Sequence, residues 1–232
     1  MNRITVMARS TAVELLRRRT VVALMVLVPL AFYAARHDLT GQSIRFLAIG
    51  LAWALSTLSA FAGIAGQAID PRLRLSGYRA GELLAGRLLG LLGLAVALTG
   101  FYAAVIMVDR RPERWPGLLL ALGLTVAVAL PFGLLVAALL RRPLEAAMLL
   151  LVVSGLQMMM DPAGSASRVL PFWSVREILT WTVDGTDLGY LQRGLVHGAL
   201  TVVLLGAATA ALRARALRGS RGSVLVQAEP TG

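Results

Sequence analysis

Residues 44–69 read IRFLAIGLAWALSTLSAFAGIAGQAI, an apolar run whose one charged side chain, Arg45, stands at its start. A run of this length is sufficient to cross the roughly 30 Å hydrocarbon core of a bilayer as a helix. Inside lipid the backbone must satisfy its own hydrogen bonds, and a helix does so within one segment. We therefore expect a transmembrane helix over these residues.

Five further apolar runs have the same character and are separated by short polar breaks; they cover residues 20–35, 83–108, 116–140, 143–160 and 188–212. The chain of 232 residues is 57% hydrophobic and only 15% charged, whereas a soluble domain is nearer half apolar and a quarter charged. The sequence predicts an all-α polytopic membrane protein, with a six-helix transmembrane domain over residues 20–216.

The first nineteen residues, MNRITVMARSTAVELLRRR, differ from these runs in being amphipathic. Helical spacing brings one face together, made of Ile4, Met7, Ala8, Thr11 and Leu15. This pattern predicts a helix over residues 1–19 that lies at the membrane surface. A signal peptide is the competing interpretation, but no small-x-small cleavage site follows the apolar run.

The distribution of arginine predicts the orientation of the chain. Six crossings place fifteen of the 23 arginines on the side of the N-terminus, in residues 3–19, 72–87, 141–142 and 213–221. Because cytoplasmic loops carry an excess of basic residues, we expect both termini in the cytoplasm. We expect residues 217–232 to form a disordered cytoplasmic tail.

The residue types that are absent limit the chemistry open to this chain. The sequence contains no cysteine and no lysine, and only two histidines, His37 and His197. A phosphate-binding P-loop uses a lysine, and a structural metal site usually takes more than two such ligands. We therefore expect no ATPase site, no metal and no enzymatic activity in this chain. The net charge of +11 does not indicate nucleic acid, because the arginines flank apolar runs.

Two connecting segments stand out. Residues 70–90, DPRLRLSGYRAGELLAGRLLG, are charged, and Asp70-Pro71 has the composition of a helix start. The four arginines there could also serve only as positive-inside anchors. Residues 161–187 are mostly neutral; positions 170–183 predict one or two short helices that dip back into the membrane, with Trp173 and Trp181 at the interface.

Four motifs carry a resemblance to a known family. They are ELLRRRTVVALMVLVPLAFYA at 14–34, GRLLG at 86–90, VLPFWSVREILTWTVDG at 169–185 and LRARALRG at 212–219. In this order the chain resembles, over nearly its whole length, the permease subunits of ATP-binding cassette (ABC) exporters of the ABC-2 type. It departs from the family in having Ser76-Gly77 where Ser-Pro is frequent, and Arg87 where lysine is frequent.

The resemblance implies an architecture and partners. It implies an interfacial elbow helix over residues 1–19 with interface residues Glu14, Arg17, Arg18 and Arg19, a coupling segment over 70–82, and an outer re-entrant segment over 161–187. The coupling segment would dock on a separate cytoplasmic ABC ATPase through Asp70, Arg72, Arg74, Tyr78, Arg79 and Glu82. That partner would bind ATP and Mg²⁺, and this chain would bind no cofactor of its own.

The same resemblance implies a second permease chain, identical or paralogous, and a location in the bacterial cytoplasmic membrane, in contact with lipid. The function expected is export of an apolar or amphipathic substrate such as a drug, lipid or natural product. Candidate pathway or gate residues are Gln157, Met158, Arg193 and His197 within the predicted spans, where polar and adaptable groups are functional candidates, and Pro171 and Trp173 in the outer re-entrant segment. Core packing and snorkelling to the interface are the alternative interpretations of these residues.

Other functions remain open at this point. A carrier that does not use ATP, a membrane scaffold and a haem-exporter-like permease of cytochrome c maturation are compatible with the same helices. An intramembrane serine protease is disfavoured because Ser154 follows two valines and stands in no nucleophile motif. Gly86 and Gly90 have helix-packing spacing, either within one chain or at a dimer seam.

Overall fold

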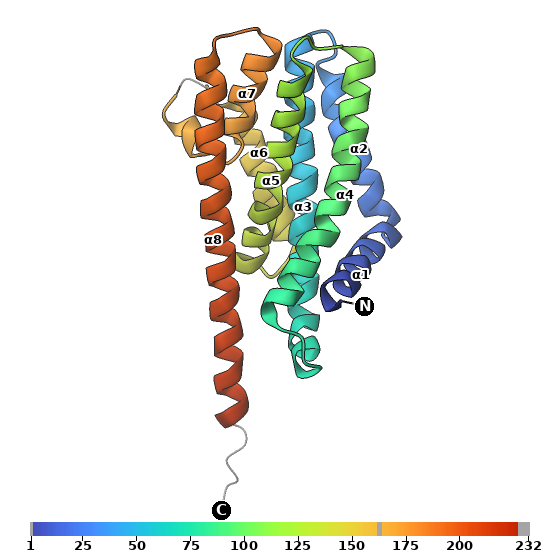
Figure 1. Ribbon diagram of the computed structural model, residues 1–232, viewed down its shortest axis with the longest axis vertical. Helices are drawn as coiled ribbons and strands as arrows, with labels where there is room; N and C mark the ends of the chain where they lie inside the picture. Colours follow the sequence, from blue (N-terminus) through green and yellow to red (C-terminus); the bar gives the residue numbers. More distant parts are fainter. Residues whose placement is uncertain (1, 162–163, 227–232) are drawn as a thin grey trace, which may run out of the picture.

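The computed structural model describes residues 2–161 and 164–226, and within them it contains helices and no strand (Figure 1). The all-helical prediction is therefore confirmed. The helices are α1 (Arg3–Arg17), α2 (Arg19–Ala35), α3 (Thr40–Leu75), α4 (Ala80–Asp109), α5 (Trp115–Leu139), α6 (Pro143–Met159), the 3₁₀ helix η1 (Ala166–Val169), α7 (Trp173–Val183) and α8 (Leu188–Val226).

Four of the described helices are long and apolar enough to cross a membrane: α3, α4, α5 and the Leu188–Arg213 part of α8. The protein is thus membrane-embedded by the length and composition of its helices. The remaining two predicted runs form α2 and α6, which are apolar but only 17 residues long each. That these two helices also cross the bilayer stays a prediction.

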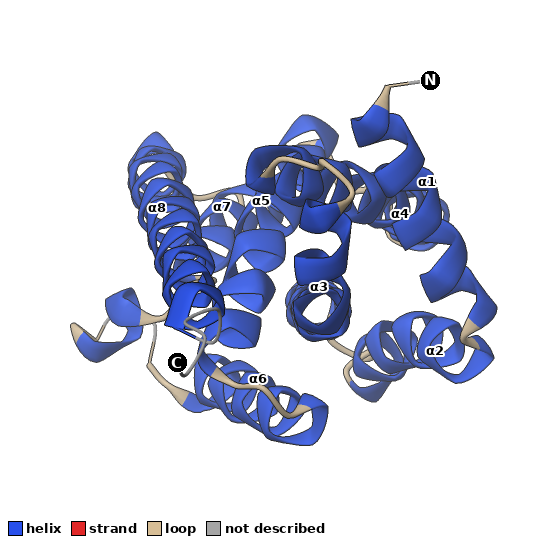
Figure 2. Cartoon of the chain, turned by 90° about the horizontal axis from the view of Figure 1, so that it is seen from below, coloured by secondary structure: helices blue, strands red, loops and turns tan. Residues whose placement is uncertain are grey.

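Helix α3 occupies the centre of the bundle, with α2, α4, α5 and α6 around it (Figure 2). Its Leu47, Leu51 and Leu55 are fully buried. A helix that is apolar around its whole circumference lies in a protein core or in a membrane, and α3 is covered mainly by the other helices. Gly133 of α5 lies directly against the backbone of Ser56, so this position has no room for a side chain.

Helix α1 packs on α4 through the face that its sequence predicts. Asn2 caps the helix by accepting a hydrogen bond from the Ile4 N–H at 3.3 Å, and Thr11 and Leu15 are buried. Gly86 and Gly90 allow the two helices to approach closely, because a Cβ on Gly90 would lie 2.5 Å from the carbonyl oxygen of Ala8. The glycine pair therefore packs within one chain, against α1.

Gly90→Leu is expected to lift α1 from α4, because a side chain there meets backbone that cannot move aside. Overpacking of this kind costs about 1–3 kcal/mol, so opening of α1 should become about five- to 150-fold more frequent. Tryptic cleavage at Arg17 to Arg19, followed in detergent, measures that opening. Gly93→Leu is the matched control on the same helix, because nothing lies within 4 Å of a Cβ at that position. Equal cleavage of both variants would contradict close packing of α1 at Gly90.

Helix α7 confirms that the 170–183 segment is helical, as one α-helix preceded by the short η1. It packs against α3, α5 and α8, and its Ile178 and Leu179 are buried. Its depth in the membrane stays a prediction. Helix α8 continues to Val226, and the disordered tail over residues 217–232 stays a prediction. Residues 227–232 lie outside the described part.

Candidate functional site at the arginine-rich end

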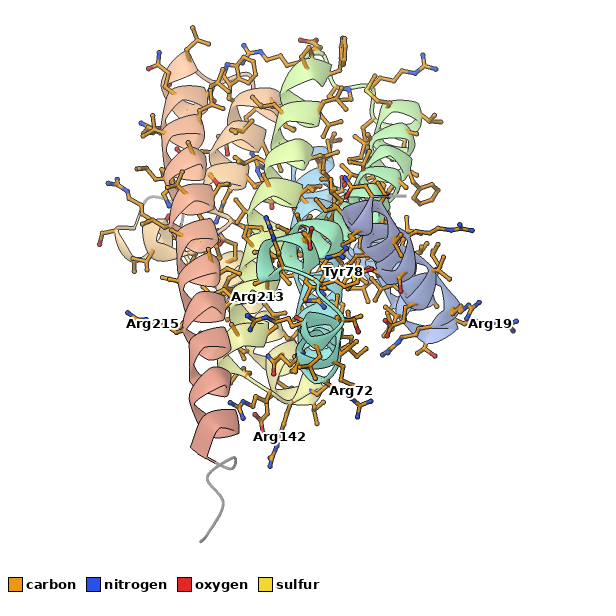
Figure 3. All side chains as sticks on the ribbon, turned by 60° about the horizontal axis from the view of Figure 1, so that its bottom comes forward. Arg19, Arg72, Tyr78, Arg142, Arg213 and Arg215 are labelled. Carbon is orange, nitrogen blue, oxygen red and sulfur yellow. The ribbon has the colours of Figure 1, made fainter. Side chains whose placement is uncertain are left out.

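One end of the bundle carries α1, the turn between α3 and α4, and the C-terminal half of α8 (Figure 1). We call it the arginine-rich end. Four arginines point away from the bundle there: Arg19, Arg72, Arg142 and Arg215 (Figure 3). The α3–α4 turn extends beyond the ends of α5 and α6. Residues 70–82, which include this turn, are named the α3–α4 tip below.

The tip is built differently from the sequence prediction. No new helix starts at Asp70-Pro71; α3 continues through both residues to Leu75. A proline near a helix end removes only one hydrogen bond of the helix, and the Asp70 carboxylate has another partner instead of acting as a cap. Helix α4 then begins at Ala80, where the Arg79 N–H donates to Glu82 Oε2 at 2.7 Å.

Gly77 closes α3 with a left-handed conformation, φ +87°. The Tyr78 N–H donates to the Leu73 carbonyl at 3.1 Å, and the Gly77 N–H donates to the Arg74 carbonyl at 3.0 Å. These two bonds make a Schellman cap, which satisfies the last carbonyls of a helix. Proline cannot adopt this φ, so Ser-Gly at this position forms a turn that a Ser-Pro sequence could not form in the same way.

A buried ion pair joins α3 to α4 at the base of the tip. The Arg87 guanidinium on α4 donates to both oxygens of Asp70 on α3, Nη2 to Oδ1 at 2.8 Å and Nη1 to Oδ2 at 3.2 Å. The Arg87 side chain is 3% exposed and that of Asp70 is 17% exposed. Gly66 lies flat against the guanidinium, and a Cβ at this position would overlap it. Asp70 thus faces inward, toward α4.

A groove of about 560 Å³ opens beside the tip between α3, α4, the α5–α6 connection and α8. Its polar lining comes from Gln67, Asp70, Arg141 and Arg213. The Gln67 side chain donates to the Ala137 carbonyl at 2.5 Å, which ties α3 to α5. The groove therefore has a positively charged rim on a mostly apolar wall, an arrangement suited to an amphipathic or anionic group.

Arg3 joins α1 to the tip, a contact that the sequence analysis missed. Its guanidinium donates to the Gly77 carbonyl, lies 5.4 Å from the centre of the Tyr78 ring, and lies 3.9 Å from Glu82. Arg3 precedes Gly77 by 74 residues, so no local pattern indicates the pairing. The contact means that a displacement of the tip also acts on α1.

Leu75 is a second feature that the sequence analysis missed. It ends α3 and is 91% exposed. Arg72 and Arg79 are exposed beside it, while Arg74 and Tyr78 are half-buried. A fully exposed leucine between arginines is a recognisable interface signal, since apolar anchors surrounded by polar residues are typical of interface centres. Of the six predicted docking residues, Arg72 and Arg79 are therefore exposed, and the other four are partly buried.

The predicted elbow residues lie where α1 passes into α2. Arg18 leaves helical geometry with ψ 81° and separates the two helices. Its side chain pairs with Glu14 at 2.7 Å, and both side chains are about half exposed. Arg17 and Arg19 are exposed. Their place at the membrane interface stays a prediction.

The predicted pathway residues lie at the opposite end, in two groups. Gln157 and Met158 line a small cavity between α3, α6 and α7. Trp173 packs its ring 5.0 Å from that of His197, and His197 Nε2 donates to the Arg168 carbonyl at 2.7 Å. The half-exposed Arg193 reaches the buried Glu177 at 3.2 Å.

Pro171 and Arg176 also lie at the opposite end. Pro171 is half-buried in the connection between η1 and α7 and belongs to neither group. Arg176, which sequence analysis did not single out, lines the same cavity as Gln157. Burial lowers the pKa of Arg176 from its ordinary value, and the nearby Arg45 lowers it further.

Comparison with known protein families and with curated proteins finds no match for this chain.

Proposed function

We propose that this chain is the membrane-spanning permease subunit of an ABC exporter, and that its α3–α4 tip docks on a separate ATPase subunit in the cytoplasm. The observation that carries the proposal is the tip itself. It extends past neighbouring helices, exposes Leu75 between arginines, and is held at its base by the Asp70–Arg87 pair.

The chemistry of the tip favours a soluble protein with an acidic groove. Exposed arginines steer and orient an acidic partner, and an apolar side chain at the centre of such a contact supplies binding energy as it is buried. The Schellman cap, the Glu82 cap and the buried ion pair hold these groups in a fixed geometry. A rigid tip transmits force better than a flexible loop.

The position of α3 gives the proposed mechanism. Because α3 lies at the centre of the bundle and runs unbroken to the tip, movement of the tip is movement of the central helix. The contact of Arg3 with Gly77 would make α1 move together with α3 and the tip. ATP binding and hydrolysis in the partner would drive the helices between two arrangements, as packed helices shift between discrete states. ATP and Mg²⁺ belong to the partner in this mechanism.

The surface of α8 supports a membrane setting and an adjoining second permease chain. Only 11% of its apolar span is buried within this chain. Lipid or a second copy would cover such a face. In the proposed assembly two permease chains line one pathway in the bacterial cytoplasmic membrane, with α2 and α6 as the fifth and sixth spans. The substrate would be apolar or amphipathic.

Purification of the tagged chain from its native host in a mild detergent tests this proposal. We expect an ATPase subunit to co-elute and the eluate to hydrolyse ATP. The control is the same preparation from cells that express an unrelated tagged membrane protein. A folded chain that elutes without any ATPase would favour a carrier that does not use ATP, or a scaffold.

A further inference from the structure

A second pocket, of about 410 Å³, lies at the opposite end from the tip, between α3, η1, α7 and α8. Four arginines, two acids and two aromatic residues line it: Arg45, Arg168, Arg176, Arg193, Glu177, Asp184, Trp173 and Tyr190. Arg45 comes from α3, and the other lining residues come from the consecutive elements η1, α7 and α8 and the connection between α7 and α8. Pockets of this size accommodate small ligands or lipid head groups.

The charges in this pocket do not balance. Glu177 is paired with Arg193 at 3.2 Å, and Asp184 is paired with Arg45. Within residues 2–161 and 164–226 neither Arg168 nor Arg176 makes an ion pair. Arg168 lies over the Trp173 ring at 6.0 Å, and Arg176 donates to the Met160 carbonyl at 3.1 Å. Asp161 and Glu177 raise the pKa of Arg176, against the lowering by burial and by Arg45, but neither guanidinium has a carboxylate within ion-pair distance in this part of the chain, so both can donate to a bound anion.

A smaller cavity of about 30 Å³ lies behind the same arginines, and Arg45 and Arg176 line both spaces. Gln157 borders it and is 2% exposed, and its Oε1 has no hydrogen-bond partner in the described part of the chain. A buried amide oxygen without a partner is costly, and a cavity of this size admits a single water molecule. The polar character of the pocket therefore continues into the protein interior.

An apolar track leaves the pocket along α8. Val196, Leu200 and Leu204 are exposed, and their spacing of three, seven and eleven residues from Arg193 places them on the same helix face as Arg193. The head of an amphiphile in the pocket would therefore have its chain beside these side chains. Neighbouring Tyr190 has its ring 4.5 Å from the Arg193 guanidinium, which fits a membrane interface.

We propose that this pocket binds the phosphate group of an anionic amphiphile, with the hydrocarbon chain along Val196, Leu200 and Leu204. A single carboxylate is saturated by one guanidinium in a bidentate contact, whereas a phosphate has enough oxygens to accept from Arg168 and Arg176 together. This binding does not depend on the ATPase partner, so it stands or falls separately from the transport function.

Isothermal titration of the full chain in dodecyl maltoside tests the proposal. The probes are decyl phosphate, decylphosphocholine with the same chain length, and inorganic phosphate. We expect saturable binding of decyl phosphate, and weaker binding of both other probes, because decylphosphocholine adds a positive charge and inorganic phosphate lacks the chain.

The informative variant is Arg168→Gln, because the one side-chain contact of Arg168 in the described part of the chain is with the Trp173 ring. Loss of a charged hydrogen-bond donor should weaken decyl phosphate binding about tenfold. Arg142→Gln, at the arginine-rich end, is the matched control with unchanged affinity. Thermal unfolding followed by circular dichroism checks that both variants fold like the unmodified chain.

The Leu200→Ser variant tests the contribution of the hydrocarbon chain to binding separately from that of the head group. We expect it to weaken decyl phosphate binding about fivefold, through lost apolar contact, and to leave inorganic phosphate unaffected. Unchanged binding in Arg168→Gln, or equal binding of decylphosphocholine, would overturn the proposal. Inorganic phosphate that binds as tightly as decyl phosphate would also overturn it, and would assign the pocket to a free anion.

Discussion

Asp70→Leu is expected to lower the free energy of unfolding by about 3–5 kcal/mol, because it leaves the Arg87 guanidinium buried without its counter-ion. Arg87 is 3% exposed and the Gly66 backbone lies against its guanidinium, so the charge has little contact with solvent once its carboxylate partner is removed. The measurement is thermal unfolding of the purified chain in detergent, compared with the unmodified chain.

Two controls identify the buried pair as the cause. The double variant Asp70→Leu, Arg87→Leu removes both charges and should recover most of the lost stability, since apolar residues commonly replace buried pairs without loss. Glu145→Leu breaks the exposed pair with Arg142, whose side chains are 51% and 80% exposed, and should cost ~0–1 kcal/mol. A double variant as unstable as Asp70→Leu alone would contradict this account of the tip.

The second large effect is expected at the exposed surface of the tip. Leu75→Asp combined with Arg72→Glu should weaken association with the ATPase by about 2–4 kcal/mol, or roughly thirty- to a thousandfold, as loss of a central interface anchor does. Both side chains point away from the bundle's packed core, so the fold should be retained. Co-purified ATPase activity per mole of chain measures the change.

Arg142→Glu is the matched control for that variant. It reverses an exposed arginine at the same end of the molecule, outside the tip. We expect its ATPase association to stay within about twofold of the unmodified chain, since exposed charges away from an interface contribute little. Equal losses in both variants would indicate that general positive charge, and not the tip, recruits the partner.

Hydrophobic runs were sufficient to predict the helices of this protein. Each of the six apolar runs forms a helix in the structure, and four of these helices are long and apolar enough to cross a membrane. The amphipathic face of residues 1–19 also packs as its spacing predicts. These features depend on residues close together in the sequence, where helical periodicity is informative.

Contacts between distant residues could not be predicted in the same way. Arg87 and Asp70 are seventeen residues apart on different helices, and Arg3 is still farther from Gly77. Their pairing depends on how α1, α3 and α4 pack, which no local pattern contains. The start of a coupling helix at Asp70-Pro71 was predicted from local capping signals, and it was wrong because the Asp70 carboxylate binds Arg87.

Leu75 shows a different limit. A single leucine among arginines fits the helical pattern of α3, and only the structure shows that it lies 91% exposed at the end of that helix. The lack of ion pairs at Arg168 and Arg176 was equally hidden, because it depends on Arg45 and Arg193, from other helices, pairing with the two carboxylates of the pocket. Helical periodicity in the sequence predicts which face of a helix is buried. Which exposed residues lie together can be seen only once the arrangement of the helices is known.

The chain has no cysteine, so a single cysteine at position 75 gives the most direct test of the central claim. Leu75→Cys would be treated in membranes of the native host with a bifunctional thiol-reactive cross-linker, and Leu188→Cys at the opposite end would serve as the control. We predict a covalent adduct between position 75 and a soluble ATPase subunit, and none from position 188. Labelling of position 75 by a membrane-impermeant maleimide in intact cells, with no ATPase adduct, would contradict the account.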